Sequence, residues 1–100
     1  MAPPGDRQRL DMWLWCARLA RTRAACAALV EAGAVRINRQ PTTKPHARIA
    51  PGDVLTIALG HGPGGRILVW RVLRLADRRG PPAEAALLYR DLDAEPEEKG

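Results

Sequence analysis

The residues that could bind a metal ion are two histidines and two cysteines. Cys16 and Cys26 are ten positions apart, and neither they nor His46 and His61 form a closely spaced Cys-x2-Cys or His-x3-His pair. Structural zinc sites use such pairs to bring four ligands to one ion. Both cysteines fall on apolar faces of expected helices, where a thiol packs as a small hydrophobic group. We therefore expect core cysteines, no metal and no cofactor.

Groups for catalysis are equally scarce. The chain contains no serine, and no pair of acids is placed by an expected element to share a proton-transfer task. The glycine-rich segment 60–65 lacks the Gly-Lys-Ser/Thr ending of a phosphate-binding loop and connects two expected strands. This segment is typical of a hairpin loop, and we expect that the protein is not an enzyme.

The basic residues are more informative than the candidate catalytic groups. The chain has 16 Lys and Arg against 11 Asp and Glu, which gives a net charge of +5. Residues 7–48 alone sum to +7, residues 49–80 to +3, residues 81–100 to −4, and Asp6 supplies the remaining −1. A charge divided in this way indicates a basic recognition surface followed by an acidic tail, although a solubilising surface would also be basic.

Seven side chains of the basic region are candidates for binding phosphate groups. A guanidinium is a planar fork that matches phosphate oxygens and also stacks on bases. Helices that begin at Arg9 and after Thr22 would add backbone N–H donors. Two helices followed at once by a strand would bring the candidates to one side. These candidates for nucleic-acid binding are Arg9, Arg18, Arg21, Arg23, Arg36, Asn38 and Lys44.

The elements that must position these residues follow from periodicity. Apolar stripes predict helices over 9–20 and 23–32, the second with Thr22 as N-cap and Gly33 just after its end. Alternating residues predict a strand at 34–38, and the proline-containing segment 39–51 reads as irregular. Two further strands and a last helix complete an α+β fold of order ααβββα; their expected ranges are 54–59, 66–75 and 83–92.

Length and composition set the organisation of the chain. One hundred residues support one compact domain. We expect a flexible arm at 1–8, the domain at 9–76, a linker and C-terminal helix at 77–92, and a disordered acidic tail at 93–100. The apolar runs are far shorter than the roughly 18 residues of a membrane span, and the N-terminus does not resemble a secretory signal. A cytoplasmic protein with reduced thiols is the expectation.

Two tryptophans of the first expected helix differ in their setting. Trp13 lies on the stripe that faces the core. Trp15 lies on the other side, where it either packs beneath the C-terminal helix or stacks on a base. The stripe of Ala85, Leu88, Tyr89 and Leu92 on that last helix needs a partner, which favours burial of Trp15.

Several short motifs together resemble a known family. They are Arg9-Leu10-Asp11, Thr22-Arg23, Leu29-Val30, Gly33, Val35-Arg36-Ile37-Asn38 and Gly52-Asp53. The combination, over residues 9–59, resembles the S4 RNA-binding domain, whose α-L motif packs two helices on a small, mainly antiparallel sheet. The sequences WLWCAR and LADRRGPPAEAALLY are similar to a narrower group, the heat-shock protein 15 family.

This resemblance implies a function and a set of site residues. Members of the family bind ribosomal RNA on the large ribosomal subunit and are associated with the rescue of subunits that carry a nascent chain on tRNA under heat stress. Arg9, Arg21, Arg23, Arg36, Asn38 and Lys44 match the RNA-facing positions. Two residues depart from the pattern: Met12 stands where lysine is common, and Arg39 stands where glycine usually follows the asparagine.

Other functions remain open at this point. The domain could act with an RNA-modifying enzyme, or the helical pair could bind DNA or another protein. The expected partners are ribosomal RNA and the large subunit, with tRNA or DNA as further candidates. We expect a monomer that does not bind membranes.

Overall fold

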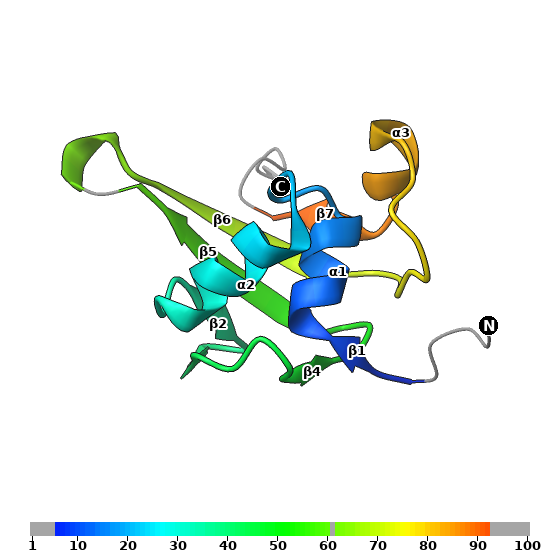
Figure 1. The fold of residues 1–100 in the computed structure, drawn as a ribbon, viewed down its shortest axis with the longest axis horizontal. Helices are drawn as coiled ribbons and strands as arrows, with labels where there is room; N and C mark the ends of the chain where they lie inside the picture. The colour runs from blue at the N-terminus through cyan, green and yellow to red at the C-terminus, as the bar shows by residue number, and fades with distance from the viewer. Residues whose placement is uncertain (1–5, 61, 93–100) are drawn as a thin grey trace, which may run out of the picture.

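The computed structural model describes residues 6–60 and 62–92. They form a five-stranded antiparallel sheet of order β3-β2-β5-β6-β7 and a two-stranded sheet of β1 and β4. Figure 1 shows α1 and α2 on one face of the larger sheet, with the β5–β6 hairpin extending past them. The predicted α+β class is confirmed. The elements are β1 Gln8–Arg9, α1 Leu10–Cys16, α2 Arg23–Glu31, β2 Val35–Ile37, β3 Gln40–Thr42, β4 Arg48–Ile49, β5 Val54–Leu59, a 3-10 turn Gly62–Gly64, β6 Arg66–Val72, α3 Pro82–Ala85 and β7 Tyr89–Asp91.

The core lies between the two helices and the sheet. Trp13 is fully buried on α1, as predicted, and its ring meets that of Trp70 on β6 edge to face at 6.4 Å between centroids. Cys16 and Cys26 are buried free thiols, and burial raises the pKa of both. The cysteines are therefore core residues. The remaining buried side chains of the cluster are Leu10, Leu14, Ala17, Val30, Val35, Ile49, Leu55, Ile57, Val72 and Leu88.

Helix α1 is shorter than predicted and stops at Cys16. Arg18 takes a left-handed conformation with φ 65°, and its N–H donates to the carbonyl of Trp15. The next N–H, from Leu19, donates to the carbonyl of Leu14. This Schellman arrangement usually has glycine at the left-handed position. The helical periodicity of residues 9–20 did not reveal the stop because no glycine marks it.

Helix α2 begins at Arg23, as predicted, and ends at Glu31, one residue before the predicted end. The Thr22 hydroxyl accepts a hydrogen bond from the Ala25 N–H at 3.0 Å. Gly33, with φ 81°, donates to the carbonyl of Val30, and Ala34 donates to that of Leu29. Both ends therefore satisfy backbone groups that the helix itself leaves unpaired.

The predicted irregular segment 39–51 contains two short strands. β3 pairs with β2 through a two-residue turn in which Asn38 and Arg39 have φ of 51° and 73°. Two positive φ values are typical of the hairpin turns that twist with their strands, and asparagine followed by glycine is favoured there. The turn keeps this geometry although arginine occupies the glycine position.

The predicted C-terminal helix over 83–92 is wrong in its second half. α3 is a single turn, and Tyr89–Asp91 instead forms β7 on the free edge of β6. Tyr89 stacks on Trp70 with ring centroids 3.9 Å apart. Edge pairing and ring stacking outweigh the helical preference of an alanine-rich and leucine-rich segment. Leu88 and Ala85 are buried, as the predicted apolar stripe suggested, although Leu88 does not lie in a helix.

Residues 74–80, which we call the strap, tie the segment after β6 to α1. The Trp13 indole N–H donates to the carbonyl of Arg74 at 2.8 Å, and Arg18 Nε donates to the carbonyl of Gly80 at 2.9 Å. Arg79 donates to the carbonyls of Trp15 and Ala20 at 3.1 and 3.2 Å. The Trp15 carbonyl, which already accepts from the Arg18 N–H, thus gains a second donor, and a cation at this end of α1 interacts favourably with the negative end of the helix dipole.

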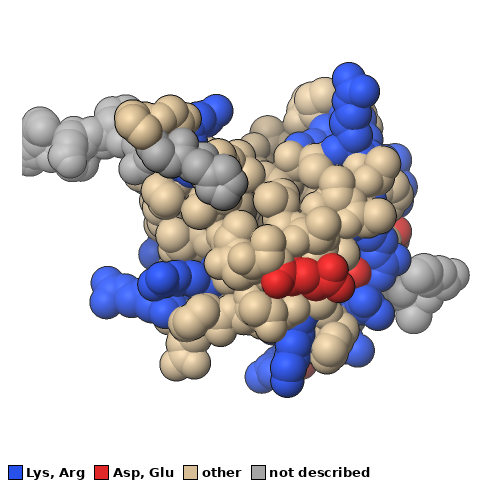
Figure 2. Space-filling view, turned by 60° about the vertical axis from the view of Figure 1, so that its left-hand side comes forward, with Lys and Arg blue, Asp and Glu red and all other residues tan. Residues whose placement is uncertain are grey.

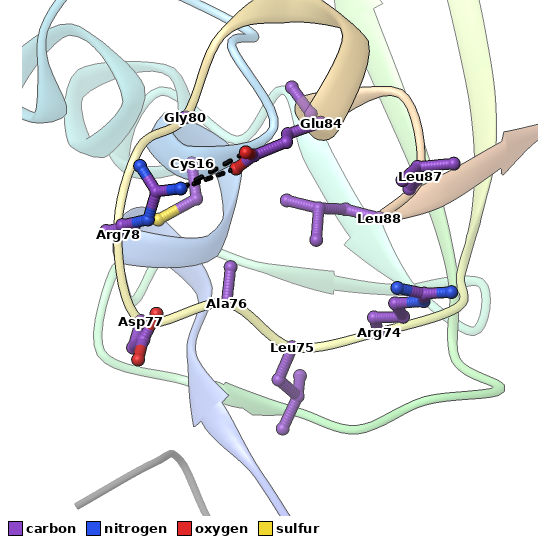
Figure 3. Close-up of a pocket in the computed structure, with 11 residues that line it drawn as sticks. Cys16, Arg74, Leu75, Ala76, Asp77, Arg78, Gly80, Glu84, Leu87 and Leu88 are labelled. Atoms are coloured by element: carbon purple, nitrogen blue, oxygen red, sulfur yellow. Dashed lines mark hydrogen bonds and ion pairs between the residues drawn. The ribbon is translucent and has the colours of Figure 1, made fainter.

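The strap also explains the setting of Trp15. The Arg79 guanidinium lies 5.6 Å from the centroid of the Trp15 ring, which is half-buried. The group that lies over the Trp15 ring is thus the Arg79 guanidinium, where the sequence had suggested the C-terminal helix. Between the strap and α3 lies a hollow of about 240 Å³, and Figure 3 shows Arg78 and Glu84 paired across it. This pair, at 3.0 Å, is exposed and contributes little to stability.

The expected flexible arm does not include Gln8. This residue lies in β1 and is buried, and its side-chain amide donates to and accepts from the backbone of Ala76 in the strap. Residues 1–5 and the predicted acidic tail 93–100 lie outside the described residues. Within the described part of the chain, no helix is long and apolar enough to cross a membrane.

The turn at Arg39 gives a stability prediction. Arg39→Gly removes a Cβ from a left-handed position, which costs an L-residue about 1–2 kcal/mol, but adds chain entropy to the unfolded state. We expect the free energy of unfolding in urea to rise by about 0.5–1 kcal/mol. Arg39→Ala removes the same side chain and keeps the Cβ, so it should give no such gain. A lower stability of the glycine variant would contradict this account of the turn.

Candidate nucleic-acid interface

Asp11 joins the first turns of α1 and α2. Its carboxylate accepts two hydrogen bonds from Arg9, at 3.1 Å from Nε and 3.0 Å from Nη2. The same carboxylate lies 3.5 Å from Nη2 of Arg23, the first residue of α2. We call Arg9, Asp11 and Arg23 the Asp11 cluster. One buried acid therefore holds two arginines from different elements on one side of the molecule.

The two arginines of the Asp11 cluster remain accessible. Their side chains are 46% and 45% exposed, whereas that of Asp11 is 6% exposed. A guanidinium has five N–H donors, and the contacts with Asp11 use two from Arg9 and one from Arg23. The remaining donors are available to an anionic ligand.

The charge state of Asp11 follows from its surroundings. Burial by itself would raise the pKa of Asp11. Hydrogen bonds and positive charge from Arg9 and Arg23 outweigh burial and lower the pKa below its ordinary value. The N–H of Met12 also donates to this carboxylate at 2.8 Å. Asp11 is thus an anion at neutral pH.

A loop and a strand bring two further cations close to the Asp11 cluster. Arg48 on β4 pairs directly with Arg9 on β1. The N–H groups of Leu10 and Asp11 donate to the carbonyls of Ala47 and Pro45, which places exposed Lys44 beside the start of α1. Arg48 was not a predicted site residue, because only the β1–β4 pairing reveals where it lies.

The backbone donors expected at the two helix starts differ in availability. The first N–H groups of α1 are already bonded to the loop at 45–47 and to Asp11. They cannot bind a phosphate in this conformation. At the start of α2, the N–H groups of Arg23 and Ala24 have no partner among the described residues. Only α2 offers the backbone donors that the sequence suggested for both helices.

Two of the predicted site residues lie near the ends of the connection between the helices. Arg18 follows the far end of α1 and donates to the carbonyl of Gly80, so it supports the strap. Arg21 is exposed and precedes the α2 N-cap. Arg18 therefore lies at the opposite end of α1 from Asp11, and α1 is about 10 Å long for its seven residues.

Arg36 and Asn38 also lie apart from the Asp11 cluster. Arg36 points away from the helices, because its neighbour Val35 is fully buried in the core. Asn38 joins two turns: its Oδ1 accepts from the Val54 N–H at 2.9 Å, and its Nδ2 donates to Asp53 at 3.0 Å. The presence of Asn38 and Asp53 in their sequence motifs is therefore explained by the turns that their side chains stabilise. The expectation that all seven candidates share one side is wrong.

The surface charge agrees with this arrangement. Figure 2 shows one face of the molecule, with Lys and Arg side chains along its margins and less of the surface acidic. Within the described residues, no group of three His, Cys, Asp or Glu side chains could hold a metal ion. The exposed guanidinium groups carry N–H donors of the kind that match phosphate oxygens.

The Asp11 cluster gives a second stability prediction. Asp11→Asn keeps the shape of the side chain but removes its charge, which should lower the free energy of unfolding by about 1–3 kcal/mol at pH 7. Because the folded-state pKa of Asp11 is lowered, its contribution is present above the unfolded-state pKa and is lost as the pH falls through the folded-state value. The two proteins should therefore become equally stable in acid.

Urea unfolding at several pH values measures this difference. Asp77→Asn is the matched control, because it neutralises an exposed acid and should leave stability unchanged. A loss of stability in Asp11→Asn that persists unchanged in acid would contradict the role of the Asp11 charge.

Comparisons with known proteins agree with the geometry. The S4 domain family matches residues 8–55. Heat shock protein 15 of Escherichia coli K12 is 38% identical over 88% of this chain and 62% of its own length. The heat shock protein 15 homolog of Haemophilus influenzae is 33% identical over 86% of this chain, again 62% of its own length. The chain thus spans less than two thirds of these relatives.

A solved structure is similar over a larger share of its length. The trimeric structure of heat shock protein 15 from Vibrio cholerae has a TM-score of 0.75 and 34% identity, and the match covers 86% of this chain and 82% of that one. Sequence and fold therefore agree over most of both chains. The protein belongs to the heat shock protein 15 family and contains an S4 domain.

Proposed function

We propose that this chain is a non-catalytic protein that binds ribosomal RNA on the large ribosomal subunit and acts in ribosome rescue or recycling under heat stress. The observation that carries the proposal is the Asp11 cluster, in which a buried acid presents two half-exposed arginines, Arg9 at the end of β1 and Arg23 at the start of α2. Membership of the heat shock protein 15 family and the S4 domain supports the choice of RNA as ligand.

Binding at this site relies on phosphate contacts. Arg9 and Arg23 retain free N–H donors, Lys44 and Arg48 lie beside them, and the start of α2 adds two backbone donors. Such contacts recognise the position of phosphates more than the identity of bases. A structured RNA, whose phosphates are held in fixed places, is the ligand that a preformed cluster of this kind fits best.

Two points from the sequence stay predictions. The cytoplasm is the compartment in which a partner of the ribosome would act. The monomeric state remains a prediction for this chain, although the Vibrio cholerae relative is described as trimeric.

The proposal predicts a charge-dependent association with large subunits. Purified large subunits should pellet the wild-type protein, and Arg9→Gln with Arg23→Gln should weaken that binding at least tenfold. The slope of log K against log salt concentration should also become shallower by about 1–2, because each lost phosphate contact contributes about 0.7–0.9. Co-sedimentation over a series of salt concentrations measures both quantities.

A variant with the same net charge is the control. Arg74→Gln with Arg78→Gln removes two exposed arginines from the strap, neither of which forms an ion pair with Asp11. This control should bind nearly as well as the wild type. If both double variants lose the same affinity, the binding reflects net charge and not this site, and if the wild type does not pellet with large subunits the proposal fails.

A further inference from the structure

The outer face of the five-stranded sheet, which points away from α1 and α2, carries a second set of basic residues. Inward positions of β2, β5 and β6 hold the buried residues Val35, Leu55, Ile57, Trp70 and Val72. The residues between them face outward. The outward-facing positions of these strands are Arg36, Val54, Thr56, Ala58, Ile67, Val69 and Arg71.

This outer face is positively charged. Within the described part of the chain, the guanidinium groups of Arg36, Arg39 and Arg71 form no hydrogen bond or ion pair with the protein. None of the outward-facing strand positions is Asp or Glu. The acid that precedes β5, Asp53, has its two carboxylate oxygens bonded to Asn38 and to the Ala50 N–H. Among the described residues, no acid therefore pairs with these three guanidinium groups.

A hollow on the same face can take one unstacked base. Its volume is about 360 Å³, within the range of small-molecule pockets, which begins at about 300 Å³. Two guanidinium groups, a threonine hydroxyl and a half-exposed isoleucine meet there, so the hollow offers polar donors, a planar stacking group and an apolar contact. The lining residues are Gly33, Ala34, Arg36, Arg39, Thr56, Ala58 and Ile67.

The spacing of the cations suits an extended strand of nucleic acid. Arg36 lies opposite Thr56, which lies opposite Val69, two residues before Arg71. Neighbouring strands lie about 4.8 Å apart, and each residue advances about 3.3 Å along a strand. Two strand spacings combined with an offset of two residues put the Arg36 and Arg71 Cα atoms about 12 Å apart. Phosphates bound at both arginines would place the intervening nucleotides across β5, beside the hollow.

We propose that this outer face binds a single-stranded segment of RNA while the Asp11 cluster holds a structured part of the same RNA. The inference rests on the proposed function and adds a second surface to it. The Asp11 cluster lies on the side of the sheet that α1 and α2 cover, and the outer face lies on the other side. Single-stranded RNA is the occupant because only an unpaired base can enter the hollow, and duplex bases remain stacked.

Two RNA probes test the second surface. One is a blunt duplex of about 12 base pairs, and the other is the same duplex with a 3′ single-stranded extension of roughly eight nucleotides, within the usual size of a single-strand site. Occupation of two linked sites should make the extended probe bind the wild-type protein at least about tenfold more tightly. Arg36→Gln with Arg71→Gln should bind the blunt duplex normally and lose most of that gain.

The other variants separate the two surfaces. Arg9→Gln with Arg23→Gln should lose the blunt duplex and still bind the extension alone, whereas Arg74→Gln with Arg78→Gln should keep the full gain. If the wild type binds the duplex but gains nothing from the extension, or if Arg36→Gln with Arg71→Gln gains as much as the wild type, the second surface is refuted and the proposed function stands. If the wild type binds neither probe nor large subunits, the proposed function itself fails.

Cross-linking gives a readout that needs no variant. With 4-thiouridine in the extension, cross-links should fall in peptides that contain Arg36 or Ile67. Cross-links confined to residues 9–23 and 44–48 would place the extension on the Asp11 cluster and would overturn the proposal.

Discussion

A single buried carboxylate, that of Asp11, determines how the first two helices meet. Its contacts with Arg9 and Arg23 neutralise a charge that could not otherwise be buried. They also fix two flexible side chains before any ligand arrives, so that less entropy is lost on binding. The arrangement links stability to function, because the same ion pairs that allow Asp11 to be buried present the guanidinium groups to solvent.

The strap secures the opposite end of α1. This helix has seven residues, too few to be stable alone, so its position depends on tertiary contacts. The carbonyl of Arg74 accepts from Trp13, while Arg79 donates to the carbonyl of Trp15 in the last turn of the helix and to that of Ala20 beyond it. Together with the Gln8 amide on Ala76, these bonds hold β1 and α1 against the strap. The segment after β6 is therefore part of the same domain as the S4 motif.

Sequence reasoning found the parts whose signals are local. The Thr22 cap, the Gly33 stop and the alternating strands needed only neighbouring residues, and all are present. It failed where distant contacts decide: Tyr89 leaves a helical pattern to stack on Trp70, since an open sheet edge attracts the segment. The predicted site residues fall on separate surfaces for a similar reason. Sequence shows that Arg36 is polar, but only the fold shows that it lies across the sheet from Arg9.

The central claim is that Asp11 acts by positioning arginines, and the affinity of Asp11→Asn for the blunt RNA duplex tests it most directly. Removing an acid from a protein that binds a polyanion should tighten binding if overall charge decides, since repulsion falls. The positioning account predicts the opposite, a several-fold weaker complex at neutral pH, with a smaller loss when Arg23→Gln is added to Asp11→Asn than when it is made in the wild type. Equal or tighter binding by a folded Asp11→Asn protein would contradict it.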